Sequence, residues 1–139
     1  MTTDPPAPCG ILEAALYARD LDAAEAFYGG LLGLERVTRA GDRHVFFRVG
    51  DTILLIFNPD ETANAKPDAR LPVPPHGARG PGHVCFATTR AEIDDWRSAL
   101  ERAGIAIEAD FEWPNGARSV YFRDPAGNSI EMAERALWF

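Results

Sequence analysis

The chain has 139 residues, 46% of them hydrophobic and 25% charged, which is the balance of a globular domain that can bury a core. Its net charge of −7 and its 14 scattered Lys and Arg residues argue against nucleic acid or an anionic membrane surface as a partner. No apolar run approaches the ~18 residues of a membrane span, and the start lacks a signal-peptide pattern. We expect a soluble, cytoplasmic protein that binds a small molecule.

The first half of the chain reads as a strand, a helix and three strands after a polar, Pro-rich tail at residues 1–9 that we expect to be flexible. A strand is expected at residues 11–18, followed by a helix that Asp20 caps and that Gly29-Gly30 ends early. Further strands are expected at residues 34–39, 43–49 and 52–58.

The second half repeats this order after a Pro-rich linker at residues 59–82. Thr89 and Glu92 form a capping-box pattern that begins a helix ending near Gly104. Strands are expected at residues 105–108, 119–123 and 129–133, the last two joined by a tight turn. We therefore expect one domain at residues 10–139, made of modules at residues 10–58 and 83–139.

Superposing the two modules pairs Glu13 with His83 and Leu54 with Glu131. Strand side chains alternate between faces, and one face of each sheet must lie under the helices. Assigning the more apolar set, which includes Ile53, to the helix face places all four paired positions on the opposite, concave face. A pseudo-twofold axis between the modules would then bring them together.

Two carboxylates and an imidazole in one cavity are unfavourable without a cation, because like charges and burial both raise a carboxyl pKa. Carboxylate oxygen and imidazole nitrogen are ligands of divalent first-row metals. Glu13, His83 and Glu131 are therefore the predicted metal ligands, although a single Glu or His in a strand is usually solvated or hydrogen-bonded.

Other polar side chains should share the concave face if Phe47 and Phe122 lie under the helices. We single out His44, Tyr121 and Arg123 as candidate catalytic or substrate-binding residues. Strand-end arginines paired with surface acids are an equally good interpretation of Arg123. Three side chains carry weaker expectations: Cys85 as a small buried hydrophobe, His76 as a solvated linker residue or a lid residue, and Trp113 as a cap on the cavity or a packing residue.

Several motifs resemble the vicinal oxygen chelate superfamily, which includes glyoxalase I, extradiol dioxygenases, fosfomycin-resistance proteins and bleomycin-binding proteins. They are Ala26-Phe27-Tyr28 with Leu32-Gly33-Leu34, Gly82-His83-Val84, and the run from Tyr121 to Glu131. The resemblance implies an α+β fold of two tandem βαβββ modules forming a curled eight-stranded mixed sheet around a central cavity. It also implies one divalent metal ion (Mn²⁺, Ni²⁺, Zn²⁺ or Fe²⁺) and a homodimer.

By this resemblance His83 and Glu131 match family ligands, whereas Glu13 stands where His or Gln is usual. Leu54 stands where glyoxalase I has a glutamate that serves as ligand and base, so a typical glyoxalase I activity is not expected.

Three functions are open from the sequence. The first is a metal-dependent enzyme that chelates adjacent oxygens of a small substrate, with the ion as Lewis acid. The second is a metal-free protein that sequesters an antibiotic-type small molecule, as bleomycin-resistance relatives do. The third, a dioxygenase that tolerates Glu13, ranks lowest.

Overall fold

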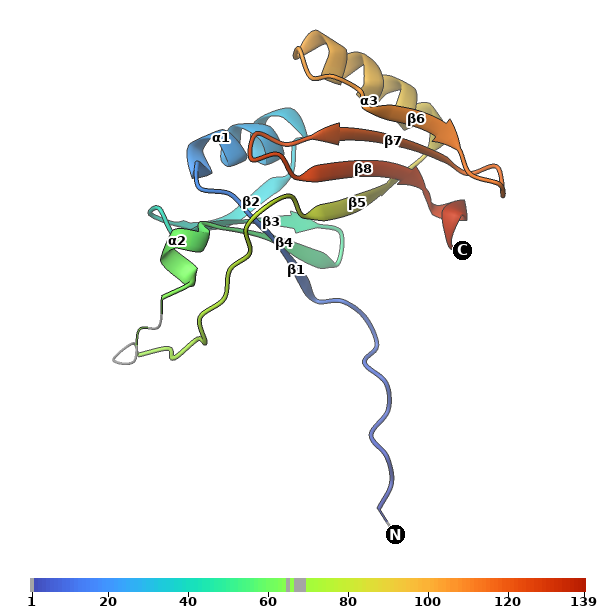
Figure 1. Cartoon of the computed structure of the whole chain (residues 1–139). Coiled ribbons are helices and arrows are strands. Elements are labelled where there is room, and N and C mark those ends of the chain that lie inside the picture. Colours follow the sequence, from blue (N-terminus) through green and yellow to red (C-terminus); the bar gives the residue numbers. More distant parts are fainter. Residues whose placement is uncertain (1, 65, 67–69) are drawn as a thin grey trace.

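Two βαβββ modules follow one another along the chain, as Figure 1 shows. The computed structural model describes residues 2–64, 66 and 70–139. Module one contains β1 (Glu13–Tyr17), α1 (Leu21–Glu25), the π-helical η1 (Ala26–Leu31), β2 (Glu35–Ala40), β3 (His44–Val49) and β4 (Thr52–Phe57). After the short helix α2 (Pro59–Thr62), module two contains β5 (His83–Thr88), α3 (Arg90–Arg102), β6 (Ala109–Glu112), β7 (Arg118–Arg123), β8 (Ser129–Glu134) and the final 3₁₀ turn η2 (Arg135–Leu137).

Each module forms its own four-stranded mixed sheet, in the orders β1-β4-β3-β2 and β5-β8-β7-β6. The first strand of each module runs parallel to the last one, and the other pairs are antiparallel. The α+β class and the repeated modules are confirmed, with the eight strands divided between two sheets. β1 and β5 are both edge strands.

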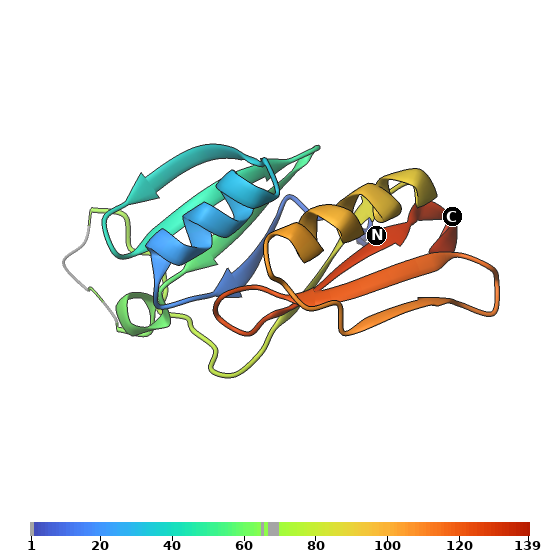
Figure 2. The same ribbon diagram turned by 90° about the horizontal axis from the view of Figure 1, so that it is seen from above.

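The helices lie on the same side of the molecule. Figures 1 and 2 show α1 over the first sheet and α3 over the second, so both uncovered sheet faces point to the other side. Within the described residues, no helix has the length and apolar character needed to cross a membrane.

The two helix starts follow the predicted capping chemistry. Asp20 accepts a hydrogen bond from the Ala23 amide, and Thr89 with Glu92 forms the complete capping box of α3. The regular helix ends early, as expected: α1 stops at Glu25, and the chain continues as the π-helical η1 from Ala26 to Leu31, which contains Gly29 and Gly30. A Cβ at Gly29 would lie 3.3 Å from the Phe47 ring, so glycine lets this helix lie close to β3.

The strand predicted at residues 105–108 was wrong, since β6 begins at Ala109. Ile105 and Ile107 contact the core, which explains their alternation with polar residues. Hydrogen bonding to β7 starts only where the Glu108 amide donates to the Tyr121 carbonyl. The alternation of apolar and polar residues indicated which side chains are buried. A segment that is not paired in a sheet can bury alternate side chains as well.

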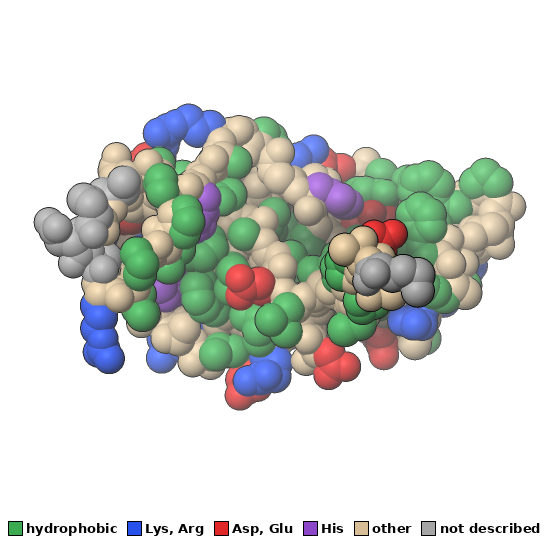
Figure 3. All heavy atoms as spheres, turned by 90° about the horizontal axis from the view of Figure 1, so that it is seen from below, with side chains coloured by type: hydrophobic (Ala, Val, Ile, Leu, Met, Phe, Trp, Pro, Cys, Tyr) green, Lys and Arg blue, Asp and Glu red, His purple; other side chains and the backbone are tan. Residues whose placement is uncertain are grey.

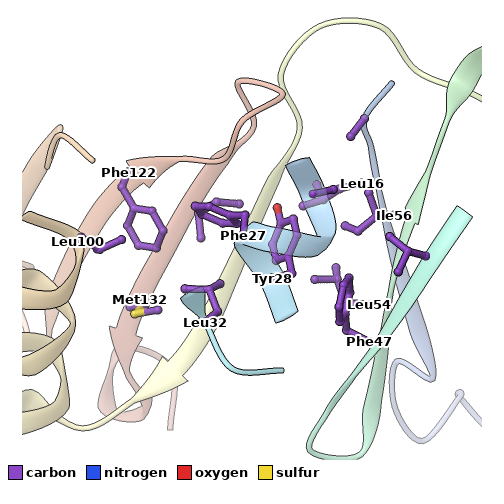
Figure 4. Close-up of a cluster of buried hydrophobic side chains, with 14 of the residues drawn as sticks. Leu16, Phe27, Tyr28, Leu32, Phe47, Leu54, Ile56, Leu100, Phe122 and Met132 are labelled. Atoms are coloured by element: carbon purple, nitrogen blue, oxygen red, sulfur yellow. The ribbon is translucent and has the colours of Figure 1, made fainter. Parts of the chain in front are cut away.

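One hydrophobic core joins the modules (Figure 4). Phe27 and Tyr28 of the first helix, and Leu32 just after it, lie between the side chains of the two sheets in this view. The Phe27 ring centroid is 6.1 Å from that of Phe122 in β7. Because this helix contributes to both modules, burying its apolar face makes them one folded unit.

The concave-face assignment of Leu54 was wrong. Leu54 is 3% exposed and belongs to the helix-side core with Leu16 and Ile56. The register pairs Ala15 with Leu55, so Leu55 lies on the uncovered face. Residues 53–57 are all apolar, so their polarity does not show which alternate side chains lie under the helix. An error of one residue then moves every side chain of the strand to the opposite face of the sheet.

A buried polar network also connects the modules. The Tyr28 hydroxyl donates to Asp124 Oδ2 at 2.6 Å, and Asn128 Nδ2 donates both to that oxygen and to the Tyr17 carbonyl. The Gly82 amide donates to Asn128 Oδ1 at 2.8 Å. Tyr28 is fully buried and Asp124 is 5% exposed. These motif residues therefore fix how the modules meet.

Replacing Tyr28 by Phe is expected to lower the free energy of unfolding by about 1–3 kcal/mol, because Asp124 would lose a buried donor. Burial raises the pKa of the Tyr28 hydroxyl, which keeps it protonated as a donor. Urea denaturation checks the loss against Tyr17→Phe, which removes a half-buried hydroxyl and should cost less. Equal costs would contradict a special role for the Tyr28 contact.

A partly exposed ion-pair cluster on module two gives an acid-sensitive contribution to stability. A hydrogen bond from Arg118, at 2.8 Å, holds the pKa of Asp110 at about 2, below its usual 3.8. A depressed carboxyl pKa contributes stability above the unfolded-state pKa and loses it as the pH falls toward the folded-state pKa. We expect the stability difference between wild type and Asp110→Asn to be about 2 kcal/mol near pH 6 and to shrink between about pH 4 and 2. Urea titrations over this range measure it, and a constant difference would contradict the assignment.

Candidate functional site

His83 and Glu131 meet on the uncovered face of the second sheet. His83 lies opposite Ser129 in the parallel β5–β8 pair, and Glu131 is two residues further along β8 on the same face. His83 Nε2 is 3.3 Å from Glu131 Oε1. The His83 side chain is 48% exposed and that of Glu131 only 7%, so the carboxylate forms the floor and the imidazole the open side.

The second polar atom of each side chain is also held. His83 Nδ1 lies 3.1 Å from the Ser129 carbonyl oxygen, which can only accept, so Nδ1 carries the proton. The Ser119 hydroxyl donates to Glu131 Oε2 at 2.6 Å, and Trp113 Nε1 donates to Ser119 Oγ at 2.8 Å. These contacts fix the orientation of both side chains.

The contact between His83 and Glu131 brings an imidazole nitrogen within 3.3 Å of a carboxylate oxygen. With a proton on Nδ1, the Nε2 atom is the one that faces the carboxylate. A second proton on the imidazole or a cation between the two atoms would make this contact favourable. An imidazole nitrogen and a buried carboxylate, each oriented by an outer hydrogen bond, fit a divalent metal ion.

Glu13 lies apart from these two side chains, on edge strand β1 of the other sheet. It is exposed on the uncovered face, two and four residues from Ala15 and Tyr17 of the same strand face. In the part of the chain that the structure describes, no three His, Cys, Asp or Glu side chains are grouped to hold one metal ion. One chain thus supplies two of the three predicted ligands to one place.

The predicted catalytic residues are divided between the uncovered faces of the two sheets. Tyr121 lies opposite Glu131 in the β7–β8 register and its ring stacks at 6.1 Å from that of His83, next to the candidate site. Burial, and then hydrogen bonding to Glu131, raises the pKa of Tyr121 to about 12. Arg123 instead donates to Glu108 at 2.7 Å, as its simpler interpretation predicts.

His44 belongs to an aromatic wall on the first sheet, made of Tyr17, His44, Phe46, Phe57 and His76. His44 stacks on Phe46 at 4.1 Å between centroids, and burial, aided by the Arg43 charge, lowers its pKa. His76 of the linker contacts Phe57 at 4.5 Å and lies 2.7 Å from the Tyr17 hydroxyl through Nδ1. His76 is therefore half buried and bound, not simply solvated.

Figure 3 views the uncovered side of both sheets. Hydrophobic side chains are spread over it and histidines appear on both halves. Cys85 is exposed here, so its prediction as a buried hydrophobe was wrong. It lies opposite Glu131 on β5, where partial desolvation by the surrounding side chains, and then the nearby Glu131 charge, raise the pKa of the thiol to about 12. The mostly apolar sequence at residues 83–88 did not reveal that one face of this strand is exposed to solvent.

The sequence matches the family described as the Glyoxalase/Bleomycin resistance protein/Dioxygenase superfamily over residues 10–132. The chain belongs to this superfamily. A crystal structure of a lactoylglutathione lyase from Agrobacterium tumefaciens is 50% identical, with a TM-score of 0.90 over 96% of this chain and 98% of that chain. A virulence protein of Salmonella typhimurium is 30% identical over 123 residues, 86% of this chain and 79% of that protein. A fosfomycin resistance protein from Mesorhizobium loti, 20% identical with a TM-score of 0.62 over 91% of this chain and 92% of its own, shares the fold.

Within this superfamily fold, the register assigns the fourth position of the repeat to Leu55. Glu131 lies opposite Cys85 in β5–β8, and the corresponding residue of β4, opposite Ala15, is Leu55. The residue type is the same as in the original pairing with Leu54. The expectation of a missing carboxylate therefore stays, with its position corrected by one residue.

Ser119 and Trp113 are the neighbours of the site whose contacts the sequence left unspecified. Strand alternation places Ser119 on the same face as Tyr121, but alternation does not indicate its hydrogen bond to Glu131. Trp113 follows β6 and reaches Ser119 because Trp113-Pro114-Asn115-Gly116 folds back as a turn, in which the Gly116 amide donates to the Trp113 carbonyl. Trp113 thus has a polar role in addition to packing.

Proposed function

We propose that the protein is a metal-dependent enzyme that binds adjacent oxygens of a small substrate at a divalent ion held by Glu13, His83 and Glu131. The observation that carries the proposal is the 3.3 Å approach of His83 Nε2 to Glu131 Oε1, with the other polar atom of each side chain already bound. A bound ion would supply Lewis-acid polarisation of a substrate oxygen. Divalent metals are common in this superfamily.

The complete ligand set is proposed to form between two copies of the chain. Both uncovered faces of one chain point to the same side, so they do not face each other (Figure 2). A twofold axis on that side would place the first sheet of one copy against the second sheet of the other. Ile11 and Leu12, which precede β1 and are 73% and 77% exposed, support a partner surface here. Each cavity would then combine Glu13 of one copy with His83 and Glu131 of the other.

The residues around this cavity suggest a division of roles. Tyr121, beside Glu131, has a pKa raised to about 12, so its hydroxyl keeps its proton well above neutral pH and would donate a hydrogen bond to a substrate oxygen. The aromatic wall would exclude water and contact the apolar part of the substrate. Leu55 supplies no base, so a typical glyoxalase I reaction is not proposed, although a relative described as a lactoylglutathione lyase supports lyase-type or isomerase-type chemistry.

Metal analysis of protein purified without chelators tests the proposal. We expect about one divalent ion per chain in wild type and a loss of affinity above 100-fold in His83→Gln, because even outer contacts of metal ligands contribute about 10–100-fold. Glu134→Gln, on the same strand as Glu131 but paired with Arg90, is the matched control and should bind as wild type. Wild-type protein that takes up no transition metal would overturn the proposal.

The aromatic wall favours one other function, a metal-free protein that sequesters a small aromatic molecule. Tyr17, Phe46 and Phe57 provide the stacking surface that such a ligand needs. In that case Phe46→Ala should abolish ligand binding while His83→Gln leaves it unchanged. The metal-dependent enzyme predicts that His83→Gln also impairs binding of an oxygen-chelating ligand.

A further inference from the structure

Two side chains beside the candidate metal ligands form a chain of hydrogen bonds that ends on Glu131. The Trp113 indole Nε1 donates to Ser119 Oγ at 2.8 Å, and the Ser119 hydroxyl donates to Glu131 Oε2 at 2.6 Å. Ser119 is fully buried and Glu131 is 5% exposed, so water has little access to the second bond. The chain of bonds therefore connects the turn after β6 with a proposed metal ligand on β8.

The direction of both hydrogen bonds follows from the chemistry of the three groups. An indole N–H only donates, and an ionised carboxylate only accepts. The serine hydroxyl accepts the bond from the indole and has a single proton of its own, which it donates to Glu131. Hydrogen bonds in such a chain polarise one another, so the indole strengthens the bond from Ser119 to the carboxylate. Trp113 thus acts on Glu131 through Ser119.

These bonds give the two oxygens of Glu131 different surroundings. Oε2 accepts from Ser119, while Oε1 lies 3.3 Å from His83 Nε2. Rotation of the carboxyl group about its last bond would break the contact with Ser119. Tyr121 and Cys85 lie opposite Glu131 in the two neighbouring strands, which limits movement of the side chain to either side. The carboxylate therefore keeps Oε1 toward the imidazole.

Trp113 is held in place by the turn to which it belongs. Its amide donates to the Ala117 carbonyl at 2.8 Å. Asn115 in the same turn donates through Nδ2 to the Ala136 carbonyl of the C-terminal segment at 3.1 Å. The Phe111 ring packs against the indole, with 4.8 Å between the ring centroids. A neighbour that is itself fixed by packing and hydrogen bonds can hold a ligand precisely.

We propose that Trp113 and Ser119 are positioning residues of the metal site, which hold Glu131 so that it binds the ion through Oε1. The inference rests on the proposed function, because it concerns the same ion. Hydrogen bonds from residues outside the coordination sphere orient a metal ligand, and their loss typically lowers metal affinity by about 10–100-fold. Ser119→Ala should lower the affinity for Zn²⁺ within this range. Trp113→Phe, which keeps an aromatic ring without the N–H, should lower it by about 10-fold.

Competition with a chromogenic chelator measures the Zn²⁺ affinity of each variant. Ser119→Thr keeps the hydroxyl and should bind Zn²⁺ as wild type does, so it separates loss of the hydrogen bond from a change in packing. Trp96→Phe is the matched control for Trp113→Phe. Trp96 is also half-buried, but it lies on α3, on the covered side of the second sheet. This control should leave the Zn²⁺ affinity unchanged.

The indole N–H resonances in NMR spectra give a readout that does not depend on activity. The chain has three tryptophans, and Trp113→Phe identifies the Trp113 signal by its loss. We expect Zn²⁺ to shift this signal in wild type and to leave that of Trp96 in place. Without metal, Ser119→Ala should move the Trp113 signal and speed exchange of its proton with water, because the acceptor of the indole N–H is lost.

The outcomes separate this inference from the proposed function. Wild type that takes up no transition metal, Zn²⁺ included, would overturn both. Wild type that binds Zn²⁺ while Ser119→Ala and Trp113→Phe bind it equally well would overturn the positioning role alone. Equal losses in Ser119→Ala and Ser119→Thr, or in Trp113→Phe and Trp96→Phe, would show an effect of packing and would also contradict the positioning role.

Discussion

Mixing two variants that each fail to bind metal is expected to restore metal binding. Glu13→Leu and Glu131→Gln each remove one carboxylate ligand, and each should lose more than about 100-fold in metal affinity as a homodimer. In a heterodimer of the two, one cavity carries both substitutions. The other combines the intact Glu13 of one copy with the intact His83 and Glu131 of its partner. Heterodimers isolated with two different tags should therefore hold about one divalent ion per dimer.

This result depends on where the ligands come from. If all three ligands belonged to one chain, every site in the heterodimer would lack a carboxylate and the mixture would stay metal-free. If Glu13 were not a ligand, Glu13→Leu alone would bind metal as wild type does. Glu35→Gln mixed with Glu131→Gln is the control for mixing, because Glu35 pairs with Arg48 on module one. In that mixture, one cavity combines Glu13 of the Glu131→Gln copy with His83 and Glu131 of the Glu35→Gln copy, and it should bind metal. Metal in this heterodimer would show that assembly itself does not remove the ion.

The sequence predicted most of the fold because its signals were local and redundant. Asp20, Thr89 and Glu92 specify helix starts through hydrogen bonds within one turn, and the structure contains them. The repeat added a second copy of each element, so a weak strand signal in one module was supported by the other. The short helix α2 inside the Pro-rich linker was missed because its four residues offer no periodicity.

The candidate site was predicted only where one strand face differed clearly from the other. Glu131 and His83 interrupt otherwise apolar strands, which fixed their face and their proximity. Placing Glu13 beside them needed the arrangement of whole modules, and alternation within a strand contains no such information. The Tyr28–Asp124–Asn128 network, which positions the modules, joins residues up to 111 positions apart when the Asn128 contact with Tyr17 is included. The sequence motif that contains Asp124 and Asn128 could be recognised, but the residues to which these side chains hydrogen-bond could not be predicted from it.

The phase of β4 illustrates the same limit and gives the sharpest test of the register. Every residue from Ile53 to Phe57 is apolar, so polarity does not distinguish the two faces. Leu54 and Leu55 are 3% and 7% exposed, which makes them nearly equal by burial alone. Their surroundings differ, because Leu54 contacts the core under the helices and Leu55 lies between Ala15 and Phe46 on the uncovered face.

A glutamate at these two positions is therefore expected to have very different effects. Leu54→Glu places a carboxylate in the core shared by both modules, where it has no route to water, and should cost more than about 4 kcal/mol. That is a large part of the about 5–15 kcal/mol that stabilises a typical domain, so the variant should be mostly unfolded. Leu55→Glu can extend its carboxylate from the uncovered face toward solvent and should remain folded.

Circular dichroism and urea denaturation distinguish the two variants, with Leu54→Gln and Leu55→Gln as controls of similar size that add no charge. In the glutamine pair the difference should persist but be smaller, because an unpaired amide costs less to bury than a carboxylate. Leu55→Glu would also place a carboxylate at the fourth position of the repeat. If two copies form the proposed cavity, this variant should bind divalent metal more tightly than wild type, and Leu55→Gln should not. A folded Leu54→Glu beside an unfolded Leu55→Glu would reverse the register and return Leu54 to the uncovered face.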